Sequence, residues 1–354
     1  MNIPDFRKVH NRFKLDGVSC NREDLKDVGY SYIKEGEAFE QSIGIFLLDW
    51  LDEREVITVT SSGTTGGPKV LEVSKQAMVN SAVRTVEFFN LPIGAKALLC
   101  LPVDFIAGKM MLVRALVLGL ELDIIPPRLN PEVPADNRYD FVAMIPQQAA
   151  HCLPFIHRFK TLLIGGAAIP QKLRHVLVKH PGCYETYGMT ETLTHIALAP
   201  VSDPPAPFKT LEGIRVSQSE EGCLNISAPH ITDELIKTND LVNCLDEQTF
   251  YFLGRKDHVI NSGGRKLFPE QIERILAEQI HLPFFLTKQK DTTFGEAPVL
   301  IIEGTEKEWP PQSLDNLHGL DKYEHPKAVF YFTQFDRTSS GKIKRDEIRR
   351  ALNL

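Results

Sequence analysis

Residues 56–69 read VITVTSSGTTGGPK. The first five, Val56–Thr60, are rich in β-branched side chains and predict a short strand. In the segment that follows, glycines let the backbone approach a ligand closely, and four hydroxyl groups with Lys69 suit a polyphosphate. Ser74 can then cap a helix, because apolar residues recur at helical spacing after it. The stretch therefore predicts a strand, a phosphate-binding loop and a helix.

This loop differs from the P-loop of nucleoside triphosphatases. That motif requires G-x-x-x-x-G-K-[ST], whereas Pro68 stands here in place of the second glycine and Val70 in place of the Ser or Thr. Taken alone, the loop is also compatible with an ordinary Ser/Gly-rich surface segment.

Short apolar runs alternate with helical patterns over the next hundred residues. The expected strands are Ala97–Leu101, Phe141–Ile145 and Thr161–Ile164, and the expected helices are Gln147–His157 and Gln171–His180. Ile106–Ile125 is largely apolar, but its four charged residues favour a buried helix followed by a strand over a membrane span. The alternation predicts an α/β fold with mostly parallel, layered sheets.

The pattern changes after about Ala199. Several prolines mark a loop, and the strand-like pieces that follow predict a smaller β unit: Gly213–Val216, Cys223–Ser227 and Phe250–Phe252. Further on we expect helices over Pro269–Gln279 and Lys344–Leu352 and strands over Val299–Ile302 and Ala328–Phe332. We therefore expect a large N-terminal domain, residues 1–254, and a small mobile α+β domain, residues 255–354.

Composition excludes several classes of protein. Apolar residues make up 43% and charged residues 24%, which is enough for a buried core. The net charge of -6 argues against a nucleic-acid-binding protein. The six cysteines contain no C-x-x-C pair, and the N-terminus shows no apolar signal segment. We expect a cytoplasmic protein without stable membrane insertion; its oligomeric state, a homo-oligomer included, stays open.

Three further motifs follow the loop in order: YGMTE at 187–191, GRKD at 254–257 with NSGG at 261–264, and RTSSGKIK at 337–344. With the loop, they resemble the adenylate-forming superfamily of acyl-CoA synthetases, peptide-synthetase adenylation domains and luciferases. The resemblance covers the chain from Val56 to its end. It implies an enzyme that activates a small carboxylate as acyl-AMP with ATP and Mg²⁺ and then transfers it to coenzyme A.

The resemblance also assigns the nucleotide-binding residues. The triphosphate loop corresponds to Ser61, Ser62, Gly63, Thr64, Thr65 and Lys69. Gly165 and Gly166 resemble the loop beside adenine, and Tyr187 with Gly188 would place an aromatic ring against the base. Thr190 would lie near the α-phosphate and Glu191 would bind Mg²⁺, because a carboxylate is a hard ligand.

The remaining matches concern the ribose, the hinge and the two half-reactions. Asp240 and Arg255 correspond to residues that contact the ribose, although Asn239 replaces the usual glycine of Thr-Gly-Asp. Asp257 corresponds to the hinge, and Gly263 with Gly264 to a loop beside the pantetheine tunnel. Lys342 corresponds to the lysine of adenylation, where it would offset charge on the phosphate oxygens.

The chain departs from the family in two places. The segment before the phosphate loop is short, so part of the usual N-terminal subdomain is missing or compressed. Phe105 stands near the acyl pocket where histidine is usual, and Gly108 follows it. Arg114 lies in an apolar helix, so it must snorkel, pair with a carboxylate or face a ligand anion.

The Gly-x-x-x-x-Val-Arg-Ala-Leu pattern around Arg114 resembles the o-succinylbenzoate–CoA ligases of menaquinone biosynthesis. Their substrate has two carboxylates, so Arg114 is our candidate for the one that is not activated. Two alternatives stay open: a ligase for another aryl or short-chain acid, and a nucleotide-binding regulator without catalysis.

Overall fold

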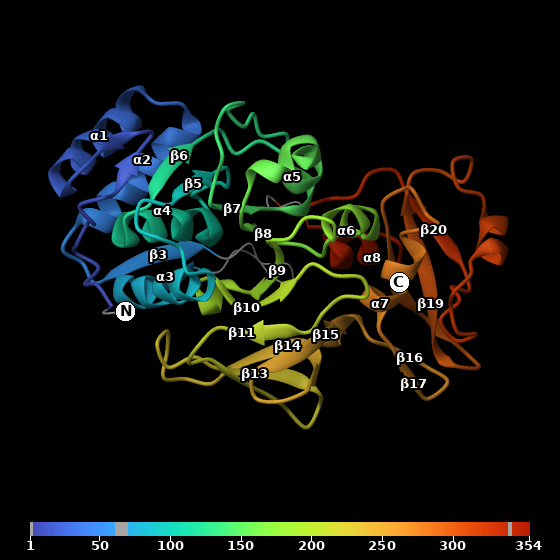
Figure 1. The fold of residues 1–354 in the computed structure, drawn as a ribbon. Coiled ribbons are helices and arrows are strands. Elements are labelled where there is room, and N and C mark those ends of the chain that lie inside the picture. Colours follow the sequence, from blue (N-terminus) through green and yellow to red (C-terminus); the bar gives the residue numbers. More distant parts are fainter. Residues whose placement is uncertain (1–2, 61–69, 339–341) are drawn as a thin grey trace.

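The computed structural model describes residues 3–60, 70–338 and 342–354 (Figure 1). Its large sheet is built around five parallel strands in the spatial order β9 (Cys183–Gly188), β8 (Leu162–Ile164), β7 (Phe141–Met144), β5 (Lys96–Leu99) and β6 (Glu121–Ile124). These strands are short and apolar because helices cover the sheet. The predicted α/β fold is confirmed.

The predicted smaller β unit is continuous with this sheet. Antiparallel strands extend it beyond β9 in the order β10 (His195–Pro200), β11 (Phe208–Thr210), β15 (Thr249–Arg255), β14 (Ile236–Cys244), β13 (Cys223–Ser227) and β12 (Arg215–Gln218). At the other edge β1 (Lys14–Leu15) pairs with β6, and β2 (Val18–Ser19) pairs with β1. The sequence did not indicate β14, whose polar and apolar residues mix along its length.

The helices that precede or accompany the parallel strands are α1 (Arg22–Glu35), α2 (Ala38–Leu51), α3 (Lys75–Phe89), α4 (Ile106–Leu118), α5 (Pro146–His151) and α6 (Gln171–Leu177). Helix α4 is buried on all sides from Met110 to its end and leads into β6, as predicted. The expected helix over Gln147–His157 is broken into α5 and a 3₁₀ turn, Leu153–Arg158. Pro154 explains the break, because it lacks the N–H that a continuing helix needs.

A two-stranded hairpin separates the phosphate-loop segment from α3. Strand β3 (Val56–Thr60) pairs with β4 (Val70–Ser74). The sequence predicted that the loop leads directly into the helix; this was wrong, because β4 lies between them. Its alternating valines and leucine suit a strand. Ser74 caps α3 as predicted, since its Oγ accepts a hydrogen bond from the Ala77 amide at 3.3 Å.

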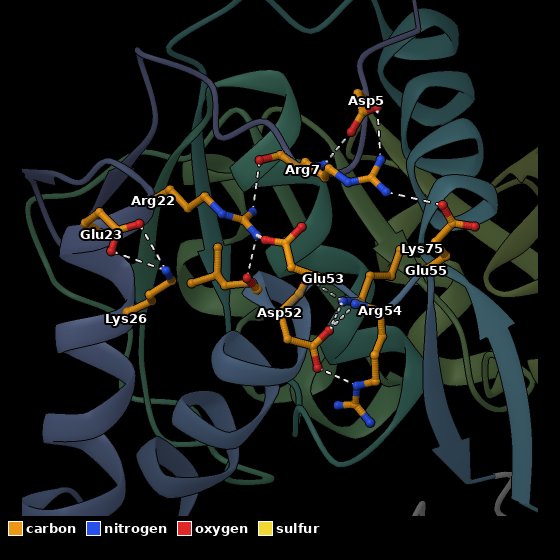
Figure 2. A network of polar contacts seen from close by, with 11 residues as sticks. Asp5, Arg7, Arg22, Glu23, Lys26, Asp52, Glu53, Arg54, Glu55 and Lys75 are labelled. Carbon is orange, nitrogen blue, oxygen red and sulfur yellow. Dashed lines mark hydrogen bonds and ion pairs between the residues drawn. The ribbon is translucent and has the colours of Figure 1, made fainter.

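A polar network holds the base of this hairpin (Figure 2). Arg22 donates to the carbonyl oxygens of Arg7, at 2.9 Å, and of Leu51. Lys75, whose side chain is fully buried, lies 2.8 Å from the Asp52 carboxylate. Its amide donates to the Glu55 carbonyl at 2.9 Å. The N-terminal segment, the end of α2 and the start of α3 are thereby fixed to one another.

A second sheet follows β15 (Figure 1). Its strands are β16 (Ile260–Ser262), β17 (Arg265–Leu267), β18 (Phe284–Asp291), β19 (Gly295–Glu303) and β20 (Val329–Phe332), and it carries α7 (Pro269–Leu276) and α8 (Arg345–Ala351). The change of sheet follows Arg255, the end of β15; the division into two domains and the mobility of the second stay predictions. Within the described ranges, no helix has both the length and the apolarity to span a bilayer.

Candidate active site

A carboxylate lies at the centre of the residues that the motifs singled out. Asp240 on β14 is 7% exposed and accepts a hydrogen bond from the Tyr187 hydroxyl at 2.6 Å. Its other oxygen accepts one from Arg255 at 3.1 Å. The sheet register brings them together, because Asp240 pairs directly with Arg255 across β14 and β15. Burial and the neighbouring carboxylate raise the pKa of Tyr187, which therefore stays protonated as the donor.

Lys342, near the far end of the chain, lies close enough to Asp240 and Arg255 for both of their charges to act on its ammonium group. Its side chain is half-buried, and burial followed by the positive charge of Arg255 lowers its pKa, while Asp240 opposes that shift. Hydrogen bonds join its backbone to Thr338, the Thr338 amide donating to the Lys342 carbonyl at 2.8 Å. We call Tyr187, Asp240, Arg255 and Lys342 the Asp240 cluster.

Side chains of α6 also contact residues that follow α7 in the chain. Lys172 lies 2.9 Å from Nδ1 of His281, and Nε2 of His175 lies 2.8 Å from Asp203 and 3.9 Å from Glu278. Figure 1 shows α6 facing the second sheet at this point. Polar side chains of α6 therefore contact the segment that follows α7, in the part of the chain that carries the second sheet.

The Tyr187 ring is packed on three sides by phenylalanines. Its centroid lies 5.8 Å from that of Phe208, 5.2 Å from Phe250 and 6.2 Å from Phe252, and the residue is 9% exposed. In this arrangement the ring is a buried part of the cluster. Its predicted stacking on adenine therefore stays a prediction.

Glycines shape the edge where the parallel strands end. A Cβ on Gly165 would lie 2.3 Å from Oγ1 of Thr186, and one on Gly188 would lie 2.3 Å from the Thr194 carbonyl. Gly166 adopts a φ of +82°, which a side chain would strain. These three glycines permit close approach of β8, β9 and β10 at this edge.

Thr190 and Glu191 lie on the turn that follows β9. Thr190 is half-buried and the Glu191 side chain is exposed. Among the described residues, no three His, Cys, Asp or Glu side chains gather into a metal site. A single exposed carboxylate suits a Mg²⁺ ion that takes its remaining oxygen ligands from nucleotide phosphates and water.

Several predicted residues lie apart from the cluster or outside the described part of the chain. The phosphate-loop residues Ser61, Ser62, Gly63, Thr64, Thr65 and Lys69 lie outside the described ranges. Gly263 and Gly264 form the turn between β16 and β17 with positive φ, and Gly263 lies against Phe294 and Tyr323. Asp257 accepts a hydrogen bond from Arg255 at 3.1 Å, directly beside the cluster.

Arg114 is buried in α4 with 2% exposure. It donates to Oγ1 of Thr194 at 2.9 Å, and its guanidinium lies 5.9 Å from the Phe141 ring centroid. Its Nε has no hydrogen-bond partner, and among the ion pairs of the described residues none joins Arg114 to a carboxylate. Burial lowers its pKa to about 9. Of the three environments that the sequence allowed, snorkelling and pairing with a carboxylate are thus excluded within the described chain.

Thr194 was not singled out by the sequence, although it lies three residues beyond Glu191. It connects Arg114 to His195, whose Nδ1 lies 3.3 Å from the Thr194 hydroxyl and whose Nε2 lies 3.1 Å from that of Thr85. Burial, followed by the charge of Arg114, holds the pKa of His195 well below its usual range. The imidazole is therefore neutral, and Arg114 carries the positive charge of this buried group.

The other two predicted acyl-site residues flank the start of α4. Phe105 precedes the helix and is half-exposed. A Cβ on Gly108 would lie 2.2 Å from the Pro102 carbonyl, so glycine is needed there for the helix to pack on the preceding turn. Contact of either residue with an acyl group stays a prediction.

Residues 37–216, about half of the chain, match a family model described as "AMP-binding enzyme". With the fold and the Asp240 cluster, this match shows that the chain belongs to the AMP-binding enzyme family. The 2-succinylbenzoate–CoA ligase of Bacillus cytotoxicus is 25% identical over 342 residues, which cover 84% of this chain and 70% of that protein. That of Enterococcus faecalis is 26% identical over 80% of this chain and 67% of its own length.

Two solved structures are similar over most of the chain. An acyl-CoA synthetase (AMP-forming)/AMP-acid ligase II-like protein from Dyadobacter fermentans is 32% identical, covers 92% of this chain and 98% of its own, and has a TM-score of 0.60. The O-succinylbenzoate coenzyme A synthetase of Bacillus subtilis, solved in complex with ATP and magnesium ion, is 19% identical with a TM-score of 0.71, covering 82% of this chain and 69% of its own. The second likeness supports the fold.

Proposed function

We propose that this chain is an AMP-forming acid–CoA ligase. The observation that carries the proposal is that Lys342, from near the end of the chain, lies within electrostatic range of the hydrogen-bonded pair of Asp240 and Arg255. A buried carboxylate that accepts hydrogen bonds suits the two hydroxyls of a ribose, and cations beside it suit a phosphate. The names of the relatives, which are ligases for coenzyme A, agree with this use of the site.

The proposed reaction has two steps. A substrate carboxylate oxygen attacks the α-phosphorus of ATP, and pyrophosphate leaves with the bonding electrons. The coenzyme A sulfur then attacks the acyl carbon, its proton is lost and AMP leaves. Lys342 would offset the charge that builds on the phosphate oxygens in the first step. Glu191 would hold the Mg²⁺ that accompanies the triphosphate.

We further propose that residues 255–354 reorient about Asp257 between these steps. Lys342 belongs to the Asp240 cluster in the arrangement described above, and we propose that adenylation uses this arrangement. Rotation would withdraw it and bring Gly263 and Gly264 towards the thiol path.

For the acid we propose o-succinylbenzoate. The Arg114 guanidinium is buried, and no carboxylate among the described residues is paired with it. A second carboxylate on the substrate would supply the counter-charge. Arg114 bonds to Thr194, immediately beyond the YGMTE motif, so it lies beside the segment that carries Thr190 and Glu191. The activity of the relatives named above supports the same acid. The product would then serve menaquinone synthesis in the cytoplasm.

The decisive experiment measures pyrophosphate release with ATP and Mg²⁺ across a panel of carboxylic acids that includes o-succinylbenzoate, with and without coenzyme A. We expect strong release with o-succinylbenzoate and a coenzyme A thioester by mass spectrometry. Release with a different acid would retain the mechanism and discard the substrate. Absence of release with every acid would contradict the proposed function.

Arg114→Met tests the substrate assignment within the same assay. We expect a loss confined to dicarboxylic acids, because monocarboxylic acids have no second charge for the guanidinium to meet. An equal effect on acids of both kinds would contradict the role of Arg114.

A further inference from the structure

A cavity with charged side chains in its lining lies away from the Asp240 cluster, at the edge of the large sheet where the parallel strands begin. Its volume is 560 Å³, which is in the range of small-molecule sites. The residues that give it charge are Arg138, Asp140, His157, Arg158, Lys160 and His180. The motif glycines and Tyr187 lie where these strands end, so the cavity is at the opposite edge. We call it the basic cleft.

Three neighbouring strands each bring a basic residue to the cleft. Arg138 precedes β7, Arg158 and Lys160 precede β8, and His180 precedes β9. Because β7, β8 and β9 are parallel and adjacent, the segments that lead into them run side by side. The sheet topology thus gathers cations that are separate in the sequence.

The backbone beneath these side chains is closely bonded. The Tyr139 amide donates to the Arg158 carbonyl at 2.9 Å, and the Lys160 amide donates to the Tyr139 carbonyl at 2.9 Å. A Cβ on Gly182 would lie 2.1 Å from the Lys160 carbonyl. Glycine therefore lets the segment that precedes β9 pack directly against the segment that precedes β8. The backbone positions that carry the charged side chains are therefore fixed, and side chains rather than these amides must bind a ligand.

The charges in the cleft are unbalanced. Arg138, Arg158 and Lys160 carry three positive charges against one negative charge from Asp140, which leaves a balance of plus two in a chain of net charge -6. Asp140 is partly engaged, since it accepts a hydrogen bond from the Lys96 amide at 3.0 Å and lies 3.9 Å from Lys160. Two imidazoles, His157 and His180, add charge when they are protonated.

The Tyr139 and Phe159 rings of the cleft are not available to a nucleobase. Tyr139 is 1% exposed and Phe159 is 6% exposed. The Arg158 guanidinium is already placed, because it lies 5.2 Å from the Phe155 ring centroid and donates to the Pro134 carbonyl at 3.3 Å. Charge, and not stacking, is therefore what the cleft offers to a ligand.

We propose that the basic cleft is a second anion site, which binds the linked phosphate groups of a small polyanion through Arg138, Arg158 and Lys160. Cationic side chains on a rigid frame suit several phosphate oxygens at once. The site is separate from the adenylating site and does not depend on the acid that the enzyme activates.

The test titrates the full-length protein, labelled with ¹³C in its histidine imidazoles, with inorganic tripolyphosphate. The resonances of His157 and His180, assigned with His157→Gln and His180→Gln, report on the cleft and not on the adenylating site. We expect both to shift and saturate. In the double variant Arg138→Ser/Lys160→Ser the affinity should fall about tenfold, the sum expected for two exposed charge contacts.

The matched control is Lys34→Ser/Lys307→Ser, which removes two exposed lysines elsewhere. It should bind tripolyphosphate as the unmodified protein does. Histidine resonances that do not move, or an equal loss in the control, would overturn the proposal. ADP and pyrophosphate should bind within about threefold of each other, since the Tyr139 and Phe159 rings are buried and the proposed contacts are all to phosphate; tenfold tighter binding of ADP would overturn recognition by phosphate alone. Pyrophosphate release should be unchanged in the double variant, which separates this test from that of the proposed function.

Discussion

Replacing Arg114 by methionine should stabilise the free protein while it removes recognition of a second carboxylate. The side chain is 2% exposed, and its only oxygen partner among the described hydrogen bonds is Thr194. An unpaired buried charge is unfavourable, and apolar replacements of similar volume often stabilise a protein. Methionine is unbranched and flexible, so it can follow the path of the arginine chain.

The magnitude follows from the pKa. Burial lowers the pKa of Arg114 from 12.5 to about 9, which corresponds to about 5 kcal/mol against the charged form at about 1.4 kcal/mol per pH unit. The variant loses a charged hydrogen bond to Thr194, about 2 kcal/mol, and the contact with the Phe141 ring, about 0.5 kcal/mol. The net expectation is a stabilisation of about 2.5 kcal/mol, or roughly 3 °C in melting temperature for a chain of this length.

The assay is thermal unfolding without ligands at pH 7. Lys75→Met is the matched control, because Lys75 is equally buried but lies 2.8 Å from the Asp52 carboxylate. Removing a paired cation should lower the free energy of unfolding by about 1 kcal/mol, and the melting temperature should fall with it. If Arg114→Met also melts below the unmodified protein, Arg114 has a counter-charge in the folded state, and the argument for a substrate carboxylate fails.

Three other predictions follow from the site. In Lys342→Ala, acyl-adenylate formation should be lost while thioester formation from supplied acyl-AMP is retained; a variant that keeps both half-reactions at the unmodified rate would refute the role, and Lys344→Ala is the control. Burial lowers the pKa of His195 well below its usual range and that of His230 to about 4, so the unfolded chain binds more protons below pH 6.5. Stability should therefore fall as the pH drops from 6.5 towards 5, by up to about 1.4 kcal/mol per pH unit for each histidine, and equilibrium unfolding of His195→Gln should show a flatter profile. Lys172→Ala should weaken the bridge to the second sheet, seen as faster proteolysis near Asp257, whereas unchanged cleavage would exclude a role in holding that arrangement.

Local patterns were sufficient for most of the elements that carry the motifs. Val56–Thr60 is a strand because β-branched residues favour one, and Ser74 begins α3 because its hydroxyl satisfies a free amide. Both signals lie within a few residues of the structure they produce. The same holds for α4, whose apolar residues on every side indicate complete burial.

Where local patterns failed, a tertiary contact decided the outcome. Strand β14 mixes polar and apolar residues because its partners β13 and β15, and not its own periodicity, define it. The smaller β unit is joined to the large sheet by the pairing of β10 with β11. The local sequence of these two strands does not predict that pairing. Such long-range pairing has no counterpart in neighbouring sequence.

The sequence by itself determined the class of enzyme, because its motifs are short segments whose order and residue types are preserved along the chain. Only the tertiary structure decided what each side chain meets. It placed the Asp240 carboxylate between Tyr187 and Arg255, and it left Arg114 buried with no carboxylate of the described residues paired to it. It also gathered Arg138 and Lys160 at the far edge of the sheet. The physical reason is that charge and burial depend on neighbours in space, which sheet register and helix packing select from distant parts of the chain.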